Sequence, residues 1–301
     1  MCVHDVGGGG ILLALKELFM GQMKVVILMA TYNGELFLRE QLDSILRQSY
    51  QDWTLYIMDD MSEDGTRHII EEYERMDSRI ISLPNHVKRG AKGTFEALMA
   101  GAHEAAYYMF ADQDDVWLER KISLTLKKMQ AEENGLVDIP VIVHSDLVVV
   151  DKTLSVIAPS FWHYSRISPR LLTSVEDLSV HNLVTGCTMM FNAAARALSL
   201  PFPKTALMHD SWVALSTAVH RGKIVSIETP LVLYRQHSCN VLGAKDFRGH
   251  YLLKKISSGV GLITDNFAAY RVVHEVAGLT FWNYCYHKWL YYKRYNKLIK
   301  G

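Results

Sequence analysis

The chain has 301 residues, of which 49% are hydrophobic and 21% are charged. These proportions supply the apolar side chains of one large core or two modest ones, which excludes an intrinsically disordered protein. The 32 Lys and Arg residues are balanced by 32 Asp and Glu residues. No global positive field therefore attracts a polyanion, and we expect no nucleic acid partner.

Two features bear on the cellular compartment. No uninterrupted apolar run reaches the ~18 residues that cross a bilayer, and the N-terminus lacks the pattern of a secretory signal. The cysteines Cys2, Cys187, Cys239 and Cys285 form no CxxC pair, so neither a zinc site nor a disulfide framework is indicated. We therefore expect a cytoplasmic protein.

Residues 1–22 are expected to be an added leader. They contain four consecutive glycines, Gly7 to Gly10, and then a short apolar run. No strand precedes these glycines, and no GxGxxG or Walker pattern follows, so a phosphate-binding loop is not indicated. We assign the leader no role.

From residue 23 onward, apolar runs with strand character alternate with segments of helical periodicity. This alternation predicts an α/β fold with a mostly parallel sheet flanked by helices. Right-handed crossovers bring the loops after the strands to one edge of the sheet, where α/β proteins bind their ligands. Strands are expected at 25–30, 55–58, 80–83, 107–111, 188–191 and 224–234, and helices at 35–48, 66–75, 92–105, 119–130 and 211–219.

Three of these loops are unusually polar: 31–35, 59–66 and 112–115. Helix capping accounts for Asp64 and Thr66. Capping does not account for Asp112, Asp114 and Asp115 together, because clustered carboxylates repel one another unless they share a cation. The sequence therefore predicts a divalent metal, Mg²⁺ or Mn²⁺, at this edge.

With these motifs in place, the sequence resembles family-2 glycosyltransferases of the GT-A fold. Within that family it is most similar to bacterial polysaccharide rhamnosyltransferase-like enzymes. The resemblance spans about residues 23–240 and implies one Rossmann-like GT-A domain there, followed by a helical extension at 241–301. It rests on Thr31-Tyr32-Asn33, the segments 59–66 and 112–117, His209-Asp210-Ser211-Trp212 and Tyr234-Arg235-Gln236-His237.

The resemblance implies a role for Asp210 as the catalytic base of a single displacement with inversion. Its carboxylate would take the proton of the acceptor hydroxyl as that hydroxyl attacks the anomeric carbon. The alternative for Asp210 is a helix N-cap, because the helix expected at 211–219 begins beside it.

The resemblance also implies a nucleotide and metal site. An Asp60 carboxylate can accept from a pyrimidine N–H, and the ring of Tyr32 can stack on the base. Asp114 would bind the metal with His237 as a further ligand, although a surface role for His237 is an equal alternative. The implied nucleotide and donor contacts are Ala30, Thr31, Tyr32, Asn33, Glu35, Asp59, Asp60, Gly90, Lys92, Asp112, Gln113 and Arg235. Weaker candidates for the sugar and acceptor cleft are Asp115, Trp117, Gly186, Cys187, His209 and Trp212.

The C-terminal segment is positively charged, although the whole chain is neutral. Residues 241–301 hold ten Lys and Arg against three Asp and Glu, a local charge of 10 − 3 = +7. Trp282, Tyr286 and Trp289 recur at i, i+4 and i+7, on one face of a helix. Two interpretations are equal: residues 281–300 bind an anionic membrane surface, or the aromatic stripe packs on the catalytic domain.

These features predict a metal-dependent inverting glycosyltransferase. It would move a sugar from a dTDP- or UDP-sugar to a hydroxyl of a glycan or polyprenyl-linked acceptor in surface polysaccharide synthesis. A sugar nucleotidyltransferase is one alternative, but the loop at 31–35 is acidic where those enzymes have glycines and basic residues. A non-catalytic nucleotide-sugar-binding module is another, against which the presence of both Asp114 and Asp210 argues. The sequence indicates no oligomeric state.

Overall fold

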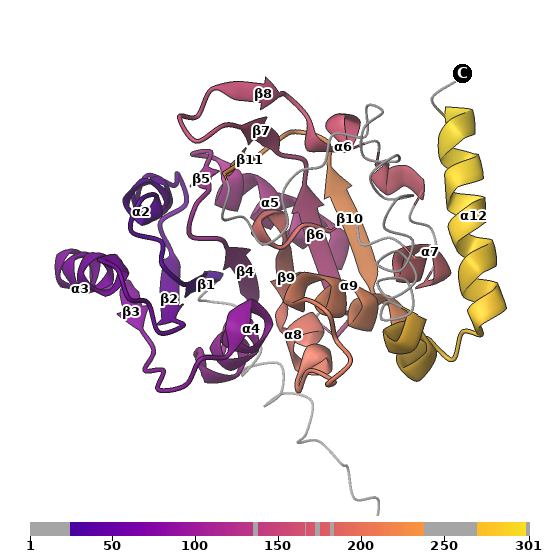
Figure 1. Ribbon diagram of the computed structural model, residues 1–301, viewed down its shortest axis with the longest axis horizontal. Coiled ribbons are helices and arrows are strands. Elements are labelled where there is room, and N and C mark those ends of the chain that lie inside the picture. The colour runs from indigo at the N-terminus through magenta and orange to yellow at the C-terminus, as the bar shows by residue number, and fades with distance from the viewer. Residues whose placement is uncertain are drawn as a thin grey trace, which may run out of the picture.

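A seven-stranded sheet forms the centre of the molecule (Figure 1). The computed structural model describes residues 25–134, 138–165, 167–171, 175–180, 184–237 and 270–298. The expected leader at 1–22 lies outside these residues, as do 241–269 of the expected extension. The sheet order is β10 (Lys223–Ile227), β6 (Val141–Ser145), β9 (Met190–Asn192), β4 (Tyr107–Ala111), β1 (Val25–Thr31), β2 (Trp53–Asp59) and β3 (Ile80–Ser82).

The predicted parallel sheet is confirmed, with one reversed strand. β9 runs antiparallel to both β4 and β6, and the other neighbouring strands run parallel. Side chains of β1 alternate between the two faces: Val25, Ile27 and Met29 belong to one core, and Val26 and Leu28 to the other. Both faces of this sheet are therefore buried, which explains why its strands are continuously apolar.

Helices cover both faces. The first core packs α2 (Leu38–Leu46), α3 (Thr66–Met76) and α5 (Lys121–Glu133), while the second packs α4 (Gly90–Gly101), α8 (Ala193–Ser199) and α9 (His209–Val219). The five helices expected from periodicity are all present, with starts or ends shifted by up to a few residues. The strands β1, β2 and β4 all end at the same edge, which brings the polar loops together as predicted.

A second sheet of four strands lies beside that edge. Its order is β5 (Val116–Trp117), β11 (Val232–Arg235), β7 (Val148–Val150) and β8 (Val156–Ala158). The single strand expected at 224–234 is wrong: β10 belongs to the large sheet and β11 to the small one. Pro230, which has no N–H to donate to a ladder, lies in the break between them.

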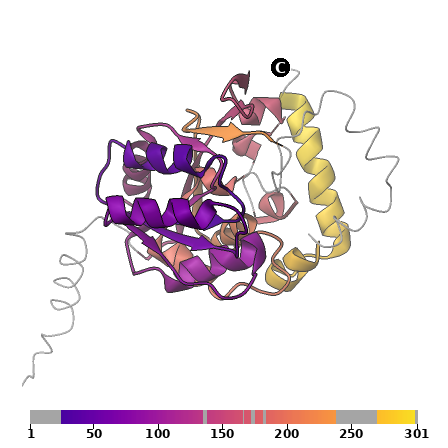
Figure 2. The same cartoon turned by 60° about the vertical axis from the view of Figure 1, so that its left-hand side comes forward.

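The remaining elements are α6 (Phe161–Tyr164), α7 (Val175–Val180), the short 3₁₀ turns η1 (Pro169–Leu171) and η2 (Gly186–Thr188), a helical stretch at 270–277, and α12 (Phe281–Leu298). Both views place α12 on the opposite side of the molecule from α3 (Figure 2). Among the described residues, no helix combines the length and apolar character needed to cross a bilayer.

The packing of α12 differs from the expected one. Tyr284, Tyr291 and Tyr295 are its buried aromatic residues, whereas Trp282 and Trp289 are exposed. The interpretation in which the Trp282 stripe packs on the domain is therefore wrong. Helical periodicity alone finds an aromatic stripe but cannot say which of two stripes faces the core.

Candidate active site

An open cavity of about 310 Å³ lies where β1, β2 and β4 end. Each of the three polar loops contributes to its wall, and the start of α9 closes the opposite side. Its size is at the lower end of the range of small-ligand sites. The lining residues are Ala30, Thr31, Tyr32, Asp60, Lys88, Gly90, Ala91, Thr94, Phe95, Asp112, Gln113, Asp114, Thr185, Gly186, Met208, His209, Asp210 and Tyr234.

Two residues expected at the nucleotide site instead join the first loop to the second. The side-chain oxygen of Asn33 accepts from the N–H of Glu63 at 2.9 Å. The carboxylate of Glu35 accepts from the N–H of Gly65 at 3.0 Å. Neither side chain lines the cavity, so the structure gives Asn33 and Glu35 a role in positioning the loops.

Asp59, also expected at the nucleotide site, does not line the cavity and instead binds neighbouring side chains. It accepts from Thr31 Oγ1 at 3.0 Å and from Arg67 Nε at 2.8 Å. Partial burial opposes ionisation of Asp59, but hydrogen bonds from Ser62 and Arg67 outweigh it and lower its pKa. The Asp59 carboxylate therefore holds the end of β1 against the second loop.

Tyr32 is presented to the cavity by Gln113. The N–H of Tyr32 donates to Gln113 Oε1 at 2.8 Å, and Gln113 Nε2 donates back to the carbonyl of Tyr32 at 3.0 Å. Gly34 allows this approach, because a Cβ there would lie 2.4 Å from Gln113 Oε1. The ring of Tyr32 is 40% exposed, and the Lys88 ammonium lies 3.8 Å from its centroid. Sequence reasoning missed Lys88, because a lysine in a loop carries no signal until the loop is placed.

Asp60 anchors the loop that precedes α4. Its carboxylate accepts from the N–H of Arg89 at 2.7 Å and from the N–H of Gly90 at 2.9 Å. Gly90 has a φ of +69°, a conformation that favours glycine. Asp60 is almost fully buried, and it is among the residues that line the cavity.

Three carboxylates line the cavity: Asp112 and Asp114 from the loop after β4, and Asp210 from α9. Burial, together with the negative charges of Asp114 and Asp210, raises the pKa of Asp112 to about 7. His237 Nε2 lies 2.7 Å from Asp114 Oδ2, so the two expected metal ligands are adjacent. A divalent cation among these groups would relieve the repulsion, and carboxylate oxygens with one imidazole are a donor set that Mn²⁺ accepts. The residues present therefore fit the expected metal.

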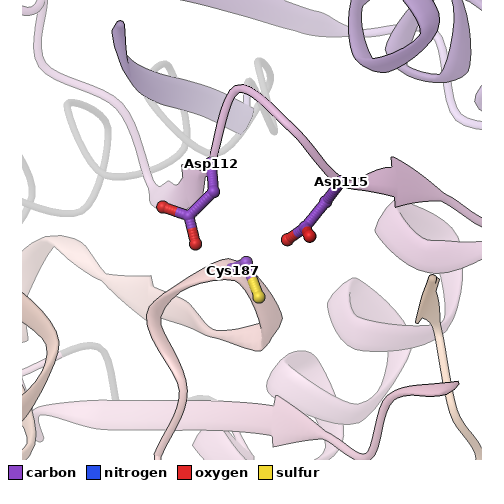
Figure 3. A group of neighbouring side chains, drawn as sticks. All are labelled: Asp112, Asp115 and Cys187. Atoms are coloured by element: carbon purple, nitrogen blue, oxygen red, sulfur yellow. The ribbon is translucent and has the colours of Figure 1, made fainter. Parts of the chain in front are cut away.

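A second acidic group lies behind the first. The candidate ligand atoms of Asp112, Asp115 and Cys187 lie within 4.8 Å of one another (Figure 3). Asp115 and Cys187 are fully buried and do not line the cavity. Burial raises the pKa of the Asp115 carboxyl and of the Cys187 thiol, which leaves the thiol a poor metal ligand. A divalent cation fits the open side, at Asp112 and Asp114, better.

Lys121 is a buried amine beside this second group. Its ammonium lies 3.0 Å from the centroid of the Trp117 ring, and it has no hydrogen-bond partner among the described residues. Burial lowers the pKa of Lys121 well below its usual value, while Asp115 and Asp112 oppose that change. Trp117 itself is a core residue and lies outside the cavity lining.

Asp210 is not a helix N-cap. α9 begins at His209 with Met208 as its N-cap, and Asp210 stands in the first turn. Asp210 Oδ2 accepts from the N–H of Gly186 at 3.1 Å, and Oδ1 accepts from the N–H of Ser211 at 2.6 Å. The carboxylate is thus fixed at the cavity wall.

His209 and Gly186 pack together beside Asp210. The His209 ring stacks on Phe95 with centroids 3.8 Å apart, and burial lowers its pKa to about 3. A Cβ at Gly186 would lie 2.8 Å from His209 Nε2, so only glycine allows this approach. Both residues line the cavity as expected, whereas Trp212 is a core residue whose indole N–H donates to the carbonyl of Ser199.

Two cations expected to contact the donor are used elsewhere. The buried guanidinium of Arg235 donates to the carbonyls of Asp114 and Lys152 and to the Glu40 carboxylate, at 2.7–2.8 Å. Lys92 Nζ donates to the carbonyl of Ala206 at 2.8 Å. Neither lines the cavity, so a diphosphate contact by these two side chains is not supported. Arg235 instead holds the Asp114 loop against the small sheet.

Residues 26–199 match glycosyl transferase family 2. The chain belongs to glycosyl transferase family 2. It is 31% identical over 232 residues to the dTDP-rhamnosyl transferase RfbG of Shigella flexneri, which covers 74% of this chain and 76% of that protein. It is 34% identical over 105 residues to an Escherichia coli UDP-Glc:alpha-D-GlcNAc-diphosphoundecaprenol beta-1,3-glucosyltransferase, WfgD. That match spans 35% of this chain and only 40% of the relative.

A solved structure supports the fold of this family-2 chain. The mannosyltransferase PcManGT of Pyrobaculum calidifontis, in complex with GDP-Man and Mn²⁺, superposes with a TM-score of 0.53 at 17% identity. The superposition covers 76% of this chain and 59% of that one. The GT-A fold expected from the sequence is thereby confirmed.

Proposed function

We propose that the protein is an inverting, metal-dependent glycosyltransferase that uses a nucleotide-sugar donor. The observation that carries the proposal is the meeting of Asp112, Asp114 and Asp210 at one cavity. The first two stand at the end of β4 and the third at the start of α9, about a hundred residues later in the chain. A site that needs a cation for a diphosphate and a base for a hydroxyl requires acidic groups on two sides of the reacting carbon.

The residues divide the chemistry between them. Asp112, Asp114 and His237 would hold Mg²⁺ or Mn²⁺, which neutralises the diphosphate as it leaves. Asp210 would accept the proton of the acceptor hydroxyl. The bond between that oxygen and the anomeric carbon then forms while the bond to the diphosphate oxygen breaks, with inversion. The backbone N–H groups of Gly186 and Ser211 hold the carboxylate of Asp210 in place at the cavity wall.

Tyr32 and Asp60 are the proposed base contacts. An exposed ring at the cavity rim can stack on a pyrimidine, and a buried carboxylate can accept from its N–H. The ammonium group of Lys88 lies above the Tyr32 ring, where it can bind a phosphate or ribose oxygen of the nucleotide. The names of the relatives, a dTDP-rhamnosyl transferase and a UDP-Glc transferase, support a pyrimidine nucleotide.

The proposed acceptor is a glycan or a polyprenyl-diphosphate-linked sugar, in surface polysaccharide synthesis. The acceptor named for the E. coli relative, a diphosphoundecaprenol-linked sugar, supports it. The expected cytoplasmic location stays a prediction, as do residues 23–240 as the bounds of the domain.

The donor can be identified by thermal denaturation with UDP, dTDP and GDP, each with and without Mn²⁺. A ligand at 100 times its Kd adds about 2.7 kcal/mol to the free energy of unfolding. We expect a Mn²⁺-dependent rise in Tm with one pyrimidine diphosphate and none with GDP. A protein whose Tm responds to none of the three would contradict a preformed donor site. Transfer from the selected donor to a lipid-linked acceptor then separates an enzyme from a binding module.

A further inference from the structure

Helix α12 has two aromatic faces, and the structure buries one of them. Tyr284 and Tyr291 are each 2% exposed, and Tyr291 and Tyr295 pack with Ile167 and Leu171 near η1. The guanidinium of Arg294 lies 3.2 Å from the buried carboxylate of Asp177 on α7. The helix is therefore docked on the body of the protein, and its orientation is set by contacts on this face.

The opposite face carries large aromatic side chains in the open. Trp282 is 80% exposed, Tyr286 56% and Trp289 55%. They are spaced i, i+4 and i+7, so they form one row along the helix. The four other tryptophans of the chain, Trp53, Trp117, Trp162 and Trp212, are at most 9% exposed.

Cations continue that row. Lys293 and Lys297 follow Trp289 at i+4 and i+8 and are exposed, and the Lys293 ammonium lies 4.8 Å from the Trp289 ring centroid. The helix contains no Asp or Glu between Phe281 and Leu298. A flat row of Trp and Tyr followed by lysines matches a membrane interface, where the rings lie among the headgroups and the ammonium groups meet lipid phosphates.

We propose that the face formed by Trp282, Tyr286, Trp289, Lys293 and Lys297 binds an anionic lipid surface. The helix of 18 residues would lie parallel to the bilayer over about 27 Å. Pairing with the same face of a second copy would bring the aromatic rows together but would also place lysines opposite lysines in a parallel arrangement. Charge complementarity favours phospholipid headgroups. The inference is independent of the proposed transfer chemistry, and it would bring the enzyme to a lipid-linked acceptor.

The test uses the full chain and vesicles of phosphatidylcholine with or without about 30% phosphatidylglycerol, which gives the vesicle a negative surface potential. We expect co-sedimentation with the anionic vesicles that weakens at high salt. W282S/Y286S/W289S should lose at least tenfold in vesicle affinity. K293Q/K297Q should lose the preference for anionic vesicles. The matched control M76S/V156S/K127Q changes two exposed apolar residues and one exposed lysine elsewhere and should bind like the parent.

Tryptophan fluorescence gives a second readout that does not depend on sedimentation. Quenching by acrylamide should come mainly from Trp282 and Trp289, because the other tryptophans are buried. Anionic vesicles should shield this fraction and shift the emission to the blue. Three results would each overturn the proposal. They are equal vesicle binding by the aromatic variant and the parent, no binding of the parent to anionic vesicles, and binding to RNA that vesicles do not compete for. Nucleotide-induced shifts in Tm, measured on the same variants, report on the donor site separately.

Discussion

Replacing Asp210 by Asn tests the assignment of the base most directly. Asparagine has nearly the shape of aspartate but cannot accept a proton at neutral pH. Removal of a general base costs about 10²–10⁴ in rate, which is about 2.7–5.4 kcal/mol of transition-state stabilisation. We expect kcat for sugar transfer to fall by that factor.

The contacts of Asp210 predict what else the substitution changes. The carboxylate accepts one N–H with each oxygen, from Gly186 and from Ser211, and an amide can accept with only one atom. Loss of one such bond costs about 1 kcal/mol and lowers Tm by roughly 2–4 °C. Asp210 also raises the pKa of Asp112, so its neutralisation should leave Mn²⁺-dependent nucleotide binding intact or slightly tighter.

The assay is release of nucleoside diphosphate with donor and acceptor present, paired with calorimetry of nucleotide binding. Ser211→Ala is the matched control, because it alters the same helical turn without touching a carboxylate. Asp210→Asn with turnover within threefold of the parent would refute the assignment. A loss of nucleotide affinity equal to the loss of rate would instead indicate damage to the donor site.

Three further predictions concern the charges around the cavity. Asp114→Ala and His237→Ala should each weaken Mn²⁺-dependent nucleotide binding by tenfold or more, measured by calorimetry, and unchanged binding in both would rule out this pair as metal ligands. In metal-free protein, the raised pKa of Asp112 means that the folded state keeps a proton that the unfolded state releases, so the contribution of Asp112 to stability should fall as pH rises from about 4 to 7. Added Mn²⁺ should reduce this pH dependence. A contribution of Asp112 that raises Tm over this pH range would contradict the prediction. Arg235→Met should cost roughly 3 kcal/mol of unfolding free energy in urea denaturation, and Arg235→Lys should not restore it, because three acceptors lose their donor at once. Normal stability together with lost nucleotide affinity would instead support a contact of Arg235 with the donor diphosphate.

The sequence alone determined the architecture and the chemical character of the site. Period-2 and period-3.6 patterns are local properties, so the βα units and the parallel sheet followed from them. The convergence of the loops at 31–35, 59–66 and 112–115 also followed, because parallel strands end at one edge. The family was evident from the motifs that these loops carry.

Tertiary packing decided which members of each motif reach the cavity. Asp59 and Asp60 are neighbours, yet one is bound by Arg67 within the loops and the other lines the cavity. Asp114 and Asp115 divide in the same way between the open site and the buried one. A strand or tight loop turns successive side chains in different directions, and only the packed neighbours show which direction is solvent.

The C-terminal helix gives the clearest case of what tertiary structure added. Its sequence contains two aromatic rows of similar size, one with Trp282 and one with Tyr284. Periodicity describes both rows equally well, and the buried carboxylate of Asp177 on another helix selects between them through Arg294. The partner of a helical face lies far away in the chain, and for that reason local sequence cannot identify it.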